Sequence, residues 1–441
     1  MPDNTTAALE LPRSLDDIDA AFMTHVLRRS GAISASNEVV SQEEKGVGMT
    51  AGYFSAIKKV RCVFKEPTDA PTTYVAKAWP SLEIAPRESI AAMFKKDIKG
   101  YQVPAAQFYP RPKTHLAAFD EAADRWVLIM EDADSYAEHK VHESELNFDE
   151  VMRMIPGLVD VAIAWEGADE GEKASQLSAL GVDLWTAPEN IGGYKALMPG
   201  GAALFDLVTC LDDSALSGGR PWSTHLGVTD FCQMMTRRLD AFFEPAKPEN
   251  GSTCTLAHGD LRGDNLFFCE GHSHYPQGWL CIDYQLMFRG PVPSDLAYLM
   301  HSGSVLPEVY RGENHRLIQR AFYDQFMART QRYKTYTFEK FLDEYLMMST
   351  VQLLYYVGFG AAITQAGAFN NDLGMRIELG GKGATEADLP PEERRQRMWW
   401  AKTFANFGES YGAFGMVERL RGLPENHEGL GPWLELPEHL R

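Results

Sequence analysis

The amino-acid sequence predicts an α+β fold, with a small β-rich N-terminal part and a larger helical C-terminal part. Segments rich in β-branched and aromatic residues, which are typical of strands, are concentrated before residue 131. Apolar residues at helical spacing dominate after residue 146. We therefore predict an N-terminal domain over residues 1–131 and a C-terminal domain over residues 132–441, with a hinge near residues 131–135.

Two helices and three strands are predicted in the N-terminal part. Ser14 can cap the first helix, and Arg28 and Arg29 lie in its last turn, where basic side chains suit the helix dipole. In the second helix, apolar residues such as Met93 and Phe94 recur at helical spacing. The elements in order are a helix over 14–29, a strand within 44–66, a turn at 67–72, a strand over 73–79, a helix over about 87–101 and a strand over 125–130.

The C-terminal part is predicted to be mainly helical, with two regions of short strands around tight turns. An exposed loop is expected at 370–394, which contains GGKG and a Pro-Pro pair. The predicted helices cover 147–166, 228–245, 307–330, 338–366 and 395–418, and the short strands lie within 254–268 and 278–284.

The net charge limits the partners of this protein. The 441 residues include 42 Lys and Arg and 61 Asp and Glu, which gives a formal net charge of −19. A surface for nucleic acid and a surface for anionic lipid both need excess positive charge, so we expect neither partner. A nucleotide is compatible with this charge, because a triphosphate needs only a few backbone amides, one or two cationic side chains and metal ions. The negative charge either serves solubility or attracts a cationic substrate.

Cysteine usage and the apolar runs predict a cytoplasmic protein. The six cysteines form no CxxC pair, so their spacing indicates neither a zinc site nor a disulfide framework, and scattered thiols suit a reducing compartment. The N-terminal segment lacks the basic and apolar regions of a secretory signal. The longest apolar run, near 353–363, is shorter than the ~18 residues that a membrane span needs. The sequence does not indicate an oligomeric state.

The most informative motif is AHGDLRGDNLFF at residues 257–268, followed by WLCIDYQ at residues 279–285. Asn265 follows Asp260 by five residues, and Asp283 follows Asp260 by 23. The segments LFF and WLCI are strand-like. A hairpin between them would bring Asn265 and Asp283 together at one end.

These side chains suit phosphoryl transfer. Mg²⁺ takes few protein ligands together with phosphate oxygens, so Asn265 and Asp283 are enough to bind it. Asp260 can accept the proton of an attacking hydroxyl and orient that hydroxyl. An Asp-rich turn is the alternative interpretation, but the offsets of Asn265 and Asp283 favour catalysis. His258 is expected to orient the loop.

The blocks HGDLRGDN and IDYQLMFRGPVPSDLAYLM resemble the aminoglycoside phosphotransferase and choline kinase superfamily, and within it the ecdysteroid kinase-like branch. The resemblance is specific over residues 254–300 and looser over most of the chain. It implies a bilobal protein-kinase-like fold that uses ATP and Mg²⁺ to phosphorylate a small hydroxylated substrate. It also implies that Asp295 supports the catalytic loop.

A kinase also needs a lysine for the α/β-phosphates and an acid that holds this lysine. Lys77 in TYVAKAW lies on a predicted strand and fits the first role. The next helix offers Glu88 and Asp97, which are nine residues apart and so lie on opposite faces. Asp97 shares the inward face with Met93 and Phe94, so we predict that Asp97 holds Lys77. Related kinases usually place Glu here.

Two further segments are predicted to contact the nucleotide. Backbone amides around Gly48, Thr50 and Gly52 could bind phosphate oxygens, although their spacing differs from G-x-G-x-x-G. The chain after the strand at 125–130 is expected to bind adenine through main-chain groups. The residues predicted to bind adenine are Met130, Glu131 and Ala133.

A small-molecule kinase fits better than a protein kinase, because only eleven residues separate Asp283 from Asp295 and leave no room for an activation loop. The resemblance favours a lipophilic alcohol, such as a steroid-like compound, as acceptor. A choline-like cation, an antibiotic and a pseudokinase without turnover are the alternatives. Arg262 and Arg289 either contact phosphate or form structural ion pairs.

Overall fold

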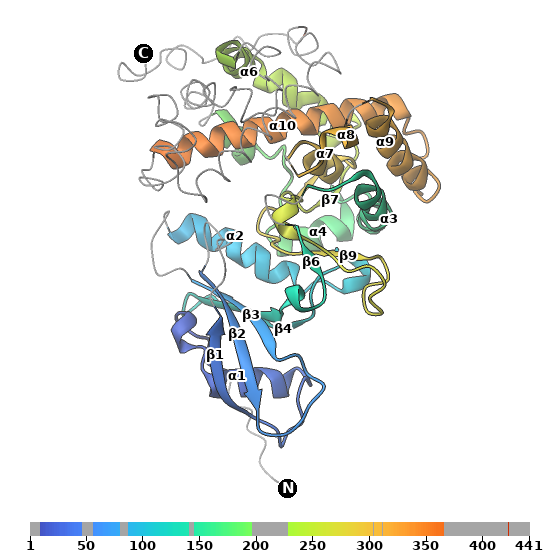
Figure 1. The fold of residues 1–441 in the computed structure, drawn as a ribbon. Helices are drawn as coiled ribbons and strands as arrows, with labels where there is room; N and C mark the ends of the chain where they lie inside the picture. Colours follow the sequence, from blue (N-terminus) through green and yellow to red (C-terminus); the bar gives the residue numbers. More distant parts are fainter. Residues whose placement is uncertain are drawn as a thin grey trace, which may run out of the picture. The chain divides into compact units, whose positions relative to one another are not determined.

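The computed structural model describes residues 9–45, 56–79, 87–140, 145–195, 228–302, 304–310, 312–365 and 422 (Figure 1). The chain divides into two compact units. Unit 1 comprises Met1–Pro104, Arg111–Glu138 and Ile282–Gln285, and unit 2 comprises Ala105–Pro110, His139–Cys281 and Leu286–Arg441. The α+β class is confirmed, because an antiparallel sheet dominates the N-terminal region and helices dominate the rest. The division between residues 131 and 132 stays a prediction.

Unit 1 is built on a five-stranded antiparallel sheet with the strand order β1-β2-β3-β5-β4. The three predicted strands are present as β2, β3 and β5, whereas β1 and β4 were not predicted. Both of these are edge strands, and β1 has the polar sequence VVSQEEK, which hides the strand pattern. The strands are β1 (Val39–Lys45), β2 (Ala56–Phe64), β3 (Thr73–Ala78), β4 (Thr114–Asp120) and β5 (Arg125–Glu131).

Helix α1 (Ala20–Arg29) packs on one face of this sheet, where it forms a core with the buried side chains of three central strands. The members of this core on α1 are Met23, Val26 and Leu27, and those on the strands include Val60, Tyr74, Ala76, Val127 and Ile129. Lys77 alternates with Ala76, so its side chain belongs to the opposite face. Val75 and its partner Met130 share that face.

Helix α2 (Arg87–Gly100) contacts β4 and β5 and is anchored by aromatic rings. The ring of Phe94 stacks on that of Trp126, with centroids 4.4 Å apart. Trp79 meets both rings edge-on. Because these rings exclude water, the inward face of α2 is fixed against the sheet.

The predicted helix over residues 14–29 is interrupted. A short 3-10 helix, η1 (Leu15–Asp17), is capped by Ser14, and α1 starts anew at Ala20. Asp19 has extended backbone dihedrals, and its carboxylate accepts the Phe22 N–H at 2.7 Å. The prediction of one continuous helix was wrong because Asp19 caps a second helix within the same apolar pattern.

Unit 2 contains seven described helices, of which α10 is the long orange helix in Figure 1. The predicted helix over 307–330 is divided into α8 and α9, and α4 was not predicted. The predictions for 370–394 and 395–418 lie outside the described residues. The helices are α3 (Phe148–Ala164), α4 (Gly171–Ala179), α6 (Val228–Phe243), α7 (Ser294–His301), α8 (Pro307–Tyr310), α9 (Gly312–Met327) and α10 (Phe338–Gln365).

Short strands frame the HGD motif in unit 2. β7 (Thr255–Ala257) pairs with β10 (Phe288–Gly290), and β8 (Leu266–Phe268) pairs with β9 (Trp279–Cys281) in a sheet with the order β6-β8-β9, where β6 is Glu138–His139. The predicted hairpin is therefore present, with Leu266 opposite Cys281. Helix α3 packs closely on it, since a Cβ atom on Gly157 would lie 2.8 Å from the Trp279 ring.

A buried carboxylate of helix α10, that of Glu344, binds the segment that precedes β7. Glu344 accepts hydrogen bonds from the Thr253 amide at 2.8 Å and the Thr253 hydroxyl at 2.6 Å. The hydroxyls of Ser252 and Tyr336 also donate to it. Four donors replace the water that this carboxylate loses on burial. None of the helices in the described part of the chain could cross a membrane.

A buried histidine predicts how the stability of this protein depends on pH. His115 on β4 is buried, with Nδ1 2.9 Å from the Ser30 hydroxyl, and burial lowers its pKa to about 4. An unfolded histidine titrates near 6.5, so the unfolded chain binds more protons between these values. The free energy of unfolding should therefore fall as the pH drops from about 6.5 towards 4.

The variant His115→Phe keeps a ring beside Tyr74 but cannot take up a proton. Its loss of unfolding free energy between pH 7 and pH 5, measured by urea denaturation, should be smaller than that of the parent by up to about 2 kcal/mol. Other buried histidines, such as His301 and His315, act equally in both proteins and cancel. Identical pH dependence in the two proteins would contradict the prediction.

Candidate active site

The HGD loop, residues 258–265, starts directly after β7 and is fixed by α7. Asp295, in the first turn of α7, accepts the backbone N–H groups of His258 at 3.0 Å and Gly259 at 3.2 Å. The hydroxyl of the buried Tyr109 donates to the same carboxylate. Asp295 therefore acts on the loop backbone.

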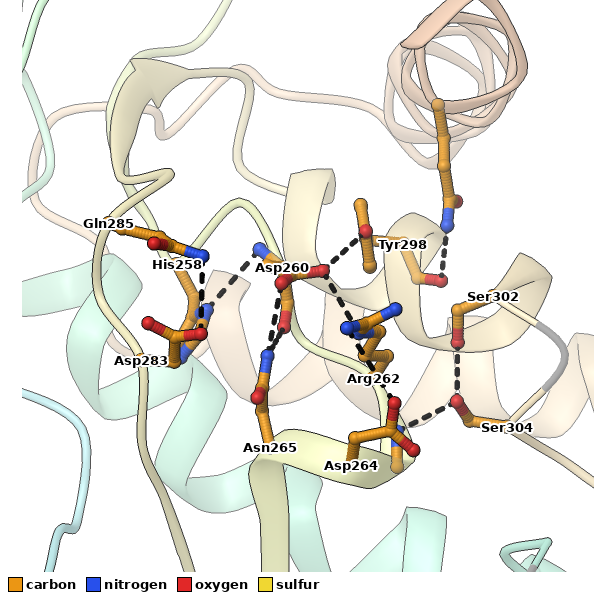
Figure 2. A network of polar contacts seen from close by, with 12 residues as sticks. His258, Asp260, Arg262, Asp264, Asn265, Asp283, Gln285, Tyr298, Ser302 and Ser304 are labelled. Carbon is orange, nitrogen blue, oxygen red and sulfur yellow. Dashed lines mark hydrogen bonds and ion pairs between the residues drawn. The ribbon is translucent and has the colours of Figure 1, made fainter. Parts of the chain in front are cut away.

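Asp260 lies at the centre of this loop with both carboxylate oxygens engaged (Figure 2). Oδ1 accepts the hydroxyl of Tyr298 at 2.6 Å, and Oδ2 accepts the Asn265 amide at 3.1 Å. The guanidinium of Arg262 lies 3.5 Å from Oδ1 and also forms an ion pair with Asp264. Only 5% of Asp260 is exposed, so its carboxylate has one defined orientation in a nearly dry site.

Asn265 ends the 3-10 turn η7 (Gly263–Asn265) and enters β8. Its amide nitrogen donates to the Asp260 carbonyl at 2.8 Å as well as to the Asp260 carboxylate. The Ser304 hydroxyl stabilises the turn by accepting the Gly263 N–H at 2.7 Å. Because the amide nitrogen is used within the loop, the amide oxygen of Asn265 is the atom that a cation would contact.

The lysine cluster, which we define as Lys77, Asp97 and Asp283, lies within unit 1. Lys77 Nζ is 2.7 Å from Asp97 Oδ2 and 2.8 Å from Asp283 Oδ1. Burial opposes the charge of Lys77, but the two carboxylates outweigh it and raise the lysine pKa. Lys77 is therefore a fixed cation. The ion pair that helix periodicity predicted for Asp97 is present, while the side chain of Glu88 lies outside the described residues.

Asp97 serves two partners with its two oxygens. Oδ2 binds Lys77, and Oδ1 accepts the backbone N–H of Tyr284 at 2.8 Å. The side chain is fully buried. Burial raises the pKa of Asp97, and the Lys77 charge opposes this shift. Asp97 thus connects β3, α2 and the 282–285 segment, which explains why a short carboxylate fits here: a backbone amide already lies next to it.

Asp283 has an unusual backbone conformation. Its φ of 74° lies in the left-handed region, which costs a residue other than glycine roughly 1–3 kcal/mol. Its N–H donates to the Tyr101 hydroxyl at 3.3 Å, and its Oδ2 accepts the Gln285 amide at 3.2 Å. These contacts and the bond to Lys77 offset the strain. Gln285 belongs to the WLCIDYQ motif, but the sequence assigned no role to it or to Tyr101.

The residues predicted to bind adenine occupy different positions. Met130 is buried on the face of the sheet that carries Lys77. Glu131 pairs with Tyr74 on the other face, and its carboxylate lies 3.9 Å from His115. Ala133 begins the turn η3 (Ala133–Ser135). The Glu131 carboxylate therefore lies on the face of the sheet opposite to Lys77, and the Glu131 N–H donates to the Lys113 carbonyl at 3.0 Å.

Lys59 and acidic residues stabilise the turn that follows β5. Lys59 Nζ lies 2.9 Å from Asp132 Oδ1 and also binds Asp134, so one cation bridges two acidic side chains of this turn.

Gly48, Thr50 and Gly52 lie outside the described residues. Arg289 is buried and donates to the Ala168 carbonyl at 3.2 Å, which indicates a structural role.

No group of three or more His, Cys, Asp or Glu side chains suited to a metal ion occurs in the part of the chain that the structure describes. A Mg²⁺ site of the predicted kind needs fewer protein ligands, because phosphate and water supply the rest. The Asn265 amide oxygen and the Asp283 carboxylate are hard oxygen donors of the required type.

A model of a known protein family matches part of the chain. The model of the ecdysteroid kinase-like family matches residues 214–335, which include the HGD loop, Asp283 and α7. This chain resembles the ecdysteroid kinase-like family. The resemblance deduced from the HGD and IDYQ blocks is thereby confirmed over this ecdysteroid kinase-like segment. None of the curated proteins matches the sequence.

Several solved structures are similar at low identity. Aminoglycoside 2′-phosphotransferase-IIIa with GDP is 12% identical, with a TM-score of 0.44, over 83% of this chain and 99% of its own. Spectinomycin phosphotransferase with ADP and spectinomycin is 11% identical, with a TM-score of 0.42, over 88% and 99%. Amicoumacin kinase with AMP-PNP and Ca²⁺ is 11% identical, with a TM-score of 0.39, over 83% and 88%.

Substitution of Gly259 in the HGD loop should strongly destabilise the protein. Its φ is +81°, and a Cβ atom would lie 2.1 Å from the Leu286 carbonyl oxygen. Gly259→Ala should lower the free energy of unfolding by the ~1–2 kcal/mol of left-handed strain plus a further ~1–3 kcal/mol for the clash. Urea denaturation measures this change.

Gly271 provides the matched control, because its φ is +74° and nothing lies within 4 Å of its Cβ position. Gly271→Ala should show the strain alone. Equal destabilisation by the two substitutions would show that Gly259 is not closely packed against residue 286.

Proposed function

We propose that this protein is an ATP- and Mg²⁺-dependent kinase that transfers the γ-phosphoryl group to a hydroxyl of a small metabolite. The observation that carries the proposal is the buried Asp260, oriented by Asn265 and Tyr298 within the ecdysteroid kinase-like segment. A buried carboxylate with a fixed orientation is what a hydroxyl acceptor needs, because the proton and the attacking oxygen must both be aligned.

Each group then has one task. Asp260 would accept the proton from the substrate hydroxyl and direct its oxygen at phosphorus. Asn265 and Asp283 would hold Mg²⁺, which when bound neutralises charge on the phosphates. Along the chain, Asn265 directly precedes Leu266 and Asp283 comes two residues after Cys281, the strand partner of Leu266, so both flank the same end of the β8–β9 hairpin.

Lys77 would bind the α/β-phosphates of ATP. Two carboxylates keep this lysine protonated and limit its motion, so its charge is presented from one place on the sheet. Val75 and Met130 lie on the same face and offer an apolar surface to the base. Phosphate contacts from Gly48, Thr50 and Gly52, and main-chain contacts from Glu131 and Ala133 to adenine, belong to the same proposal.

The acceptor that the family resemblance favours is a lipophilic alcohol, such as a steroid-like compound. The acidic composition supports a small molecule rather than nucleic acid as partner. A cytoplasmic location, expected from the sequence, stays a prediction.

Substitution of Asp260 tests the function. The parent protein, incubated with Mg-ATP and a mixed panel of alcohols, should consume ATP and form a phosphorylated product detected by mass, and EDTA should stop the reaction. Asp260→Asn should lower kcat by a factor on the order of 10²–10⁴, because the hydroxyl loses its proton acceptor. Asp324→Asn, on the exposed surface of α9, is the control and should keep full activity.

Near-parental kcat for Asp260→Asn would remove Asp260 from the mechanism. A parent protein that binds Mg-ATP but phosphorylates no acceptor in the panel would favour a pseudokinase.

Asp97 gives a second test, aimed at the nucleotide. Asp97→Asn removes the negative charge that pairs with Lys77 and keeps the shape of the side chain. The KM for ATP should rise roughly tenfold, since a hydrogen bond to a charged group contributes about 1.5–3 kcal/mol. Steady-state kinetics measure this effect. Asp97→Glu should also be impaired, because the longer side chain cannot keep the Lys77 and Tyr284 contacts together without a shift of α2.

Glu121→Gln is the control for Asp97→Asn. Glu121 forms an exposed ion pair with Lys95 of α2, the helix that also carries Asp97. Exposed pairs contribute only ~0–1 kcal/mol, so the KM for ATP should not change. An unchanged KM for Asp97→Asn would separate the Lys77–Asp97 pair from nucleotide binding.

A further inference from the structure

Tyr298 lies within the block IDYQLMFRGPVPSDLAYLM, but the sequence assigns it no role. It lies on α7, three residues after Asp295, with 7% of its surface exposed. Its hydroxyl donates to Asp260 Oδ1 at 2.6 Å, which is shorter than the contacts of Asn265 at 3.1 Å and Arg262 at 3.5 Å with that carboxylate. We propose that Tyr298 is the positioning residue that fixes the orientation of the Asp260 carboxylate. This inference rests on the proposed function and adds a residue to its mechanism.

The geometry assigns different donors to the two oxygens of Asp260. The Asn265 amide holds Oδ2, and the Tyr298 hydroxyl holds Oδ1 from the opposite side, as Figure 2 shows. Two donors on different oxygens determine the plane of a carboxylate, whereas a single donor leaves it free to rotate. A carboxylate has about four acceptor positions, so a substrate hydroxyl still finds one.

Tyr298 is itself held in place. The Gln352 side chain of α10 donates to the Tyr298 carbonyl at 3.1 Å. Asp295, one turn earlier on α7, binds the backbone of the HGD loop. Helix α7 therefore contacts the loop twice, at its backbone through Asp295 and at its reactive carboxylate through Tyr298. A small shift of α7 would move both contacts together.

Besides Tyr298 and Asn265, Arg262 and His258 are polar neighbours of Asp260. Arg262 approaches the same oxygen at 3.5 Å, and Asp264 reduces its effect by pairing with it at 3.6 Å. His258 faces the backbone, since its Nδ1 accepts the Asp260 N–H at 3.3 Å. Without the phenol hydroxyl, the longer Arg262 contact would be the remaining side-chain contact to Asp260 Oδ1 among these residues, so the carboxylate would be less firmly oriented.

The test is Tyr298→Phe, which removes one oxygen and keeps the ring. Its kcat should fall about tenfold, which corresponds to the loss of one hydrogen bond to a charged group. The KM for ATP should not change, and this split between kcat and KM separates a positioning role from a general loss of structure. Tyr323→Phe is the matched control, because its hydroxyl donates to the Tyr336 carbonyl away from the HGD loop. Its kcat and KM should equal those of the parent.

A cycle of unfolding measurements tests the contact without turnover. Tyr298→Phe, Asp260→Asn and the double variant should give non-additive unfolding free energies if the two side chains are coupled. An unchanged kcat in Tyr298→Phe would overturn the inference even if the parent is an active kinase. If the parent transfers no phosphate, the proposed function fails, and the cycle decides: additive values overturn the coupling of Tyr298 with Asp260, and non-additive values retain it.

Discussion

The buried ion pair between Lys77 and Asp97 is the interaction on which unit 1 depends. Three charged side chains, Lys77, Asp97 and Asp283, meet in a largely water-excluded site, and each is tolerated only because the others are present. Removing one partner of a buried pair costs roughly 3–5 kcal/mol, because the remaining charge is left without compensation. The pair also sets the position of α2, since Asp97 can reach Lys77 and the Tyr284 amide only when this helix lies close to β3.

Buried carboxylates that need partners also organise the HGD loop of unit 2, where the partners are mainly hydrogen-bond donors rather than an oppositely charged side chain. The Asp295 carboxylate accepts hydrogen bonds from the loop amides, and the Asp260 carboxylate accepts them from Tyr298 and Asn265. The Glu344 carboxylate accepts hydrogen bonds from the residues that precede β7. Each carboxylate has exchanged water for several directed donors, and each therefore fixes the backbone or helix that supplies them. A loop with few regular backbone bonds obtains its rigidity in this way. Rigidity matters for the proposed reaction, because a misplaced acceptor carboxylate would lose most of its effect.

Regular patterns in the sequence were sufficient to predict the main elements, and they also led to the residues of the candidate site. The spacing of Asp260, Asn265 and Asp283 reflects a loop and a hairpin, both of which are local in the chain. The choice of Asp97 over Glu88 followed from helix periodicity, since the apolar face that packs inward must carry the buried acid. The edge strand β1 was not predicted, because its polar residues are as typical of an exposed loop as of an exposed edge strand.

By itself, the sequence determined the α+β class, the position of the HGD loop and the helix face that carries Asp97, because each depends on short-range spacing. Only the tertiary structure decided which groups surround these residues. Tyr298 reaches Asp260 across 38 residues, and the Tyr284 amide reaches Asp97 across 187. The left-handed backbone of Asp283 is likewise held by contacts with distant residues. No local pattern encodes such pairings, since a hydroxyl or a backbone amide looks the same wherever its partner lies.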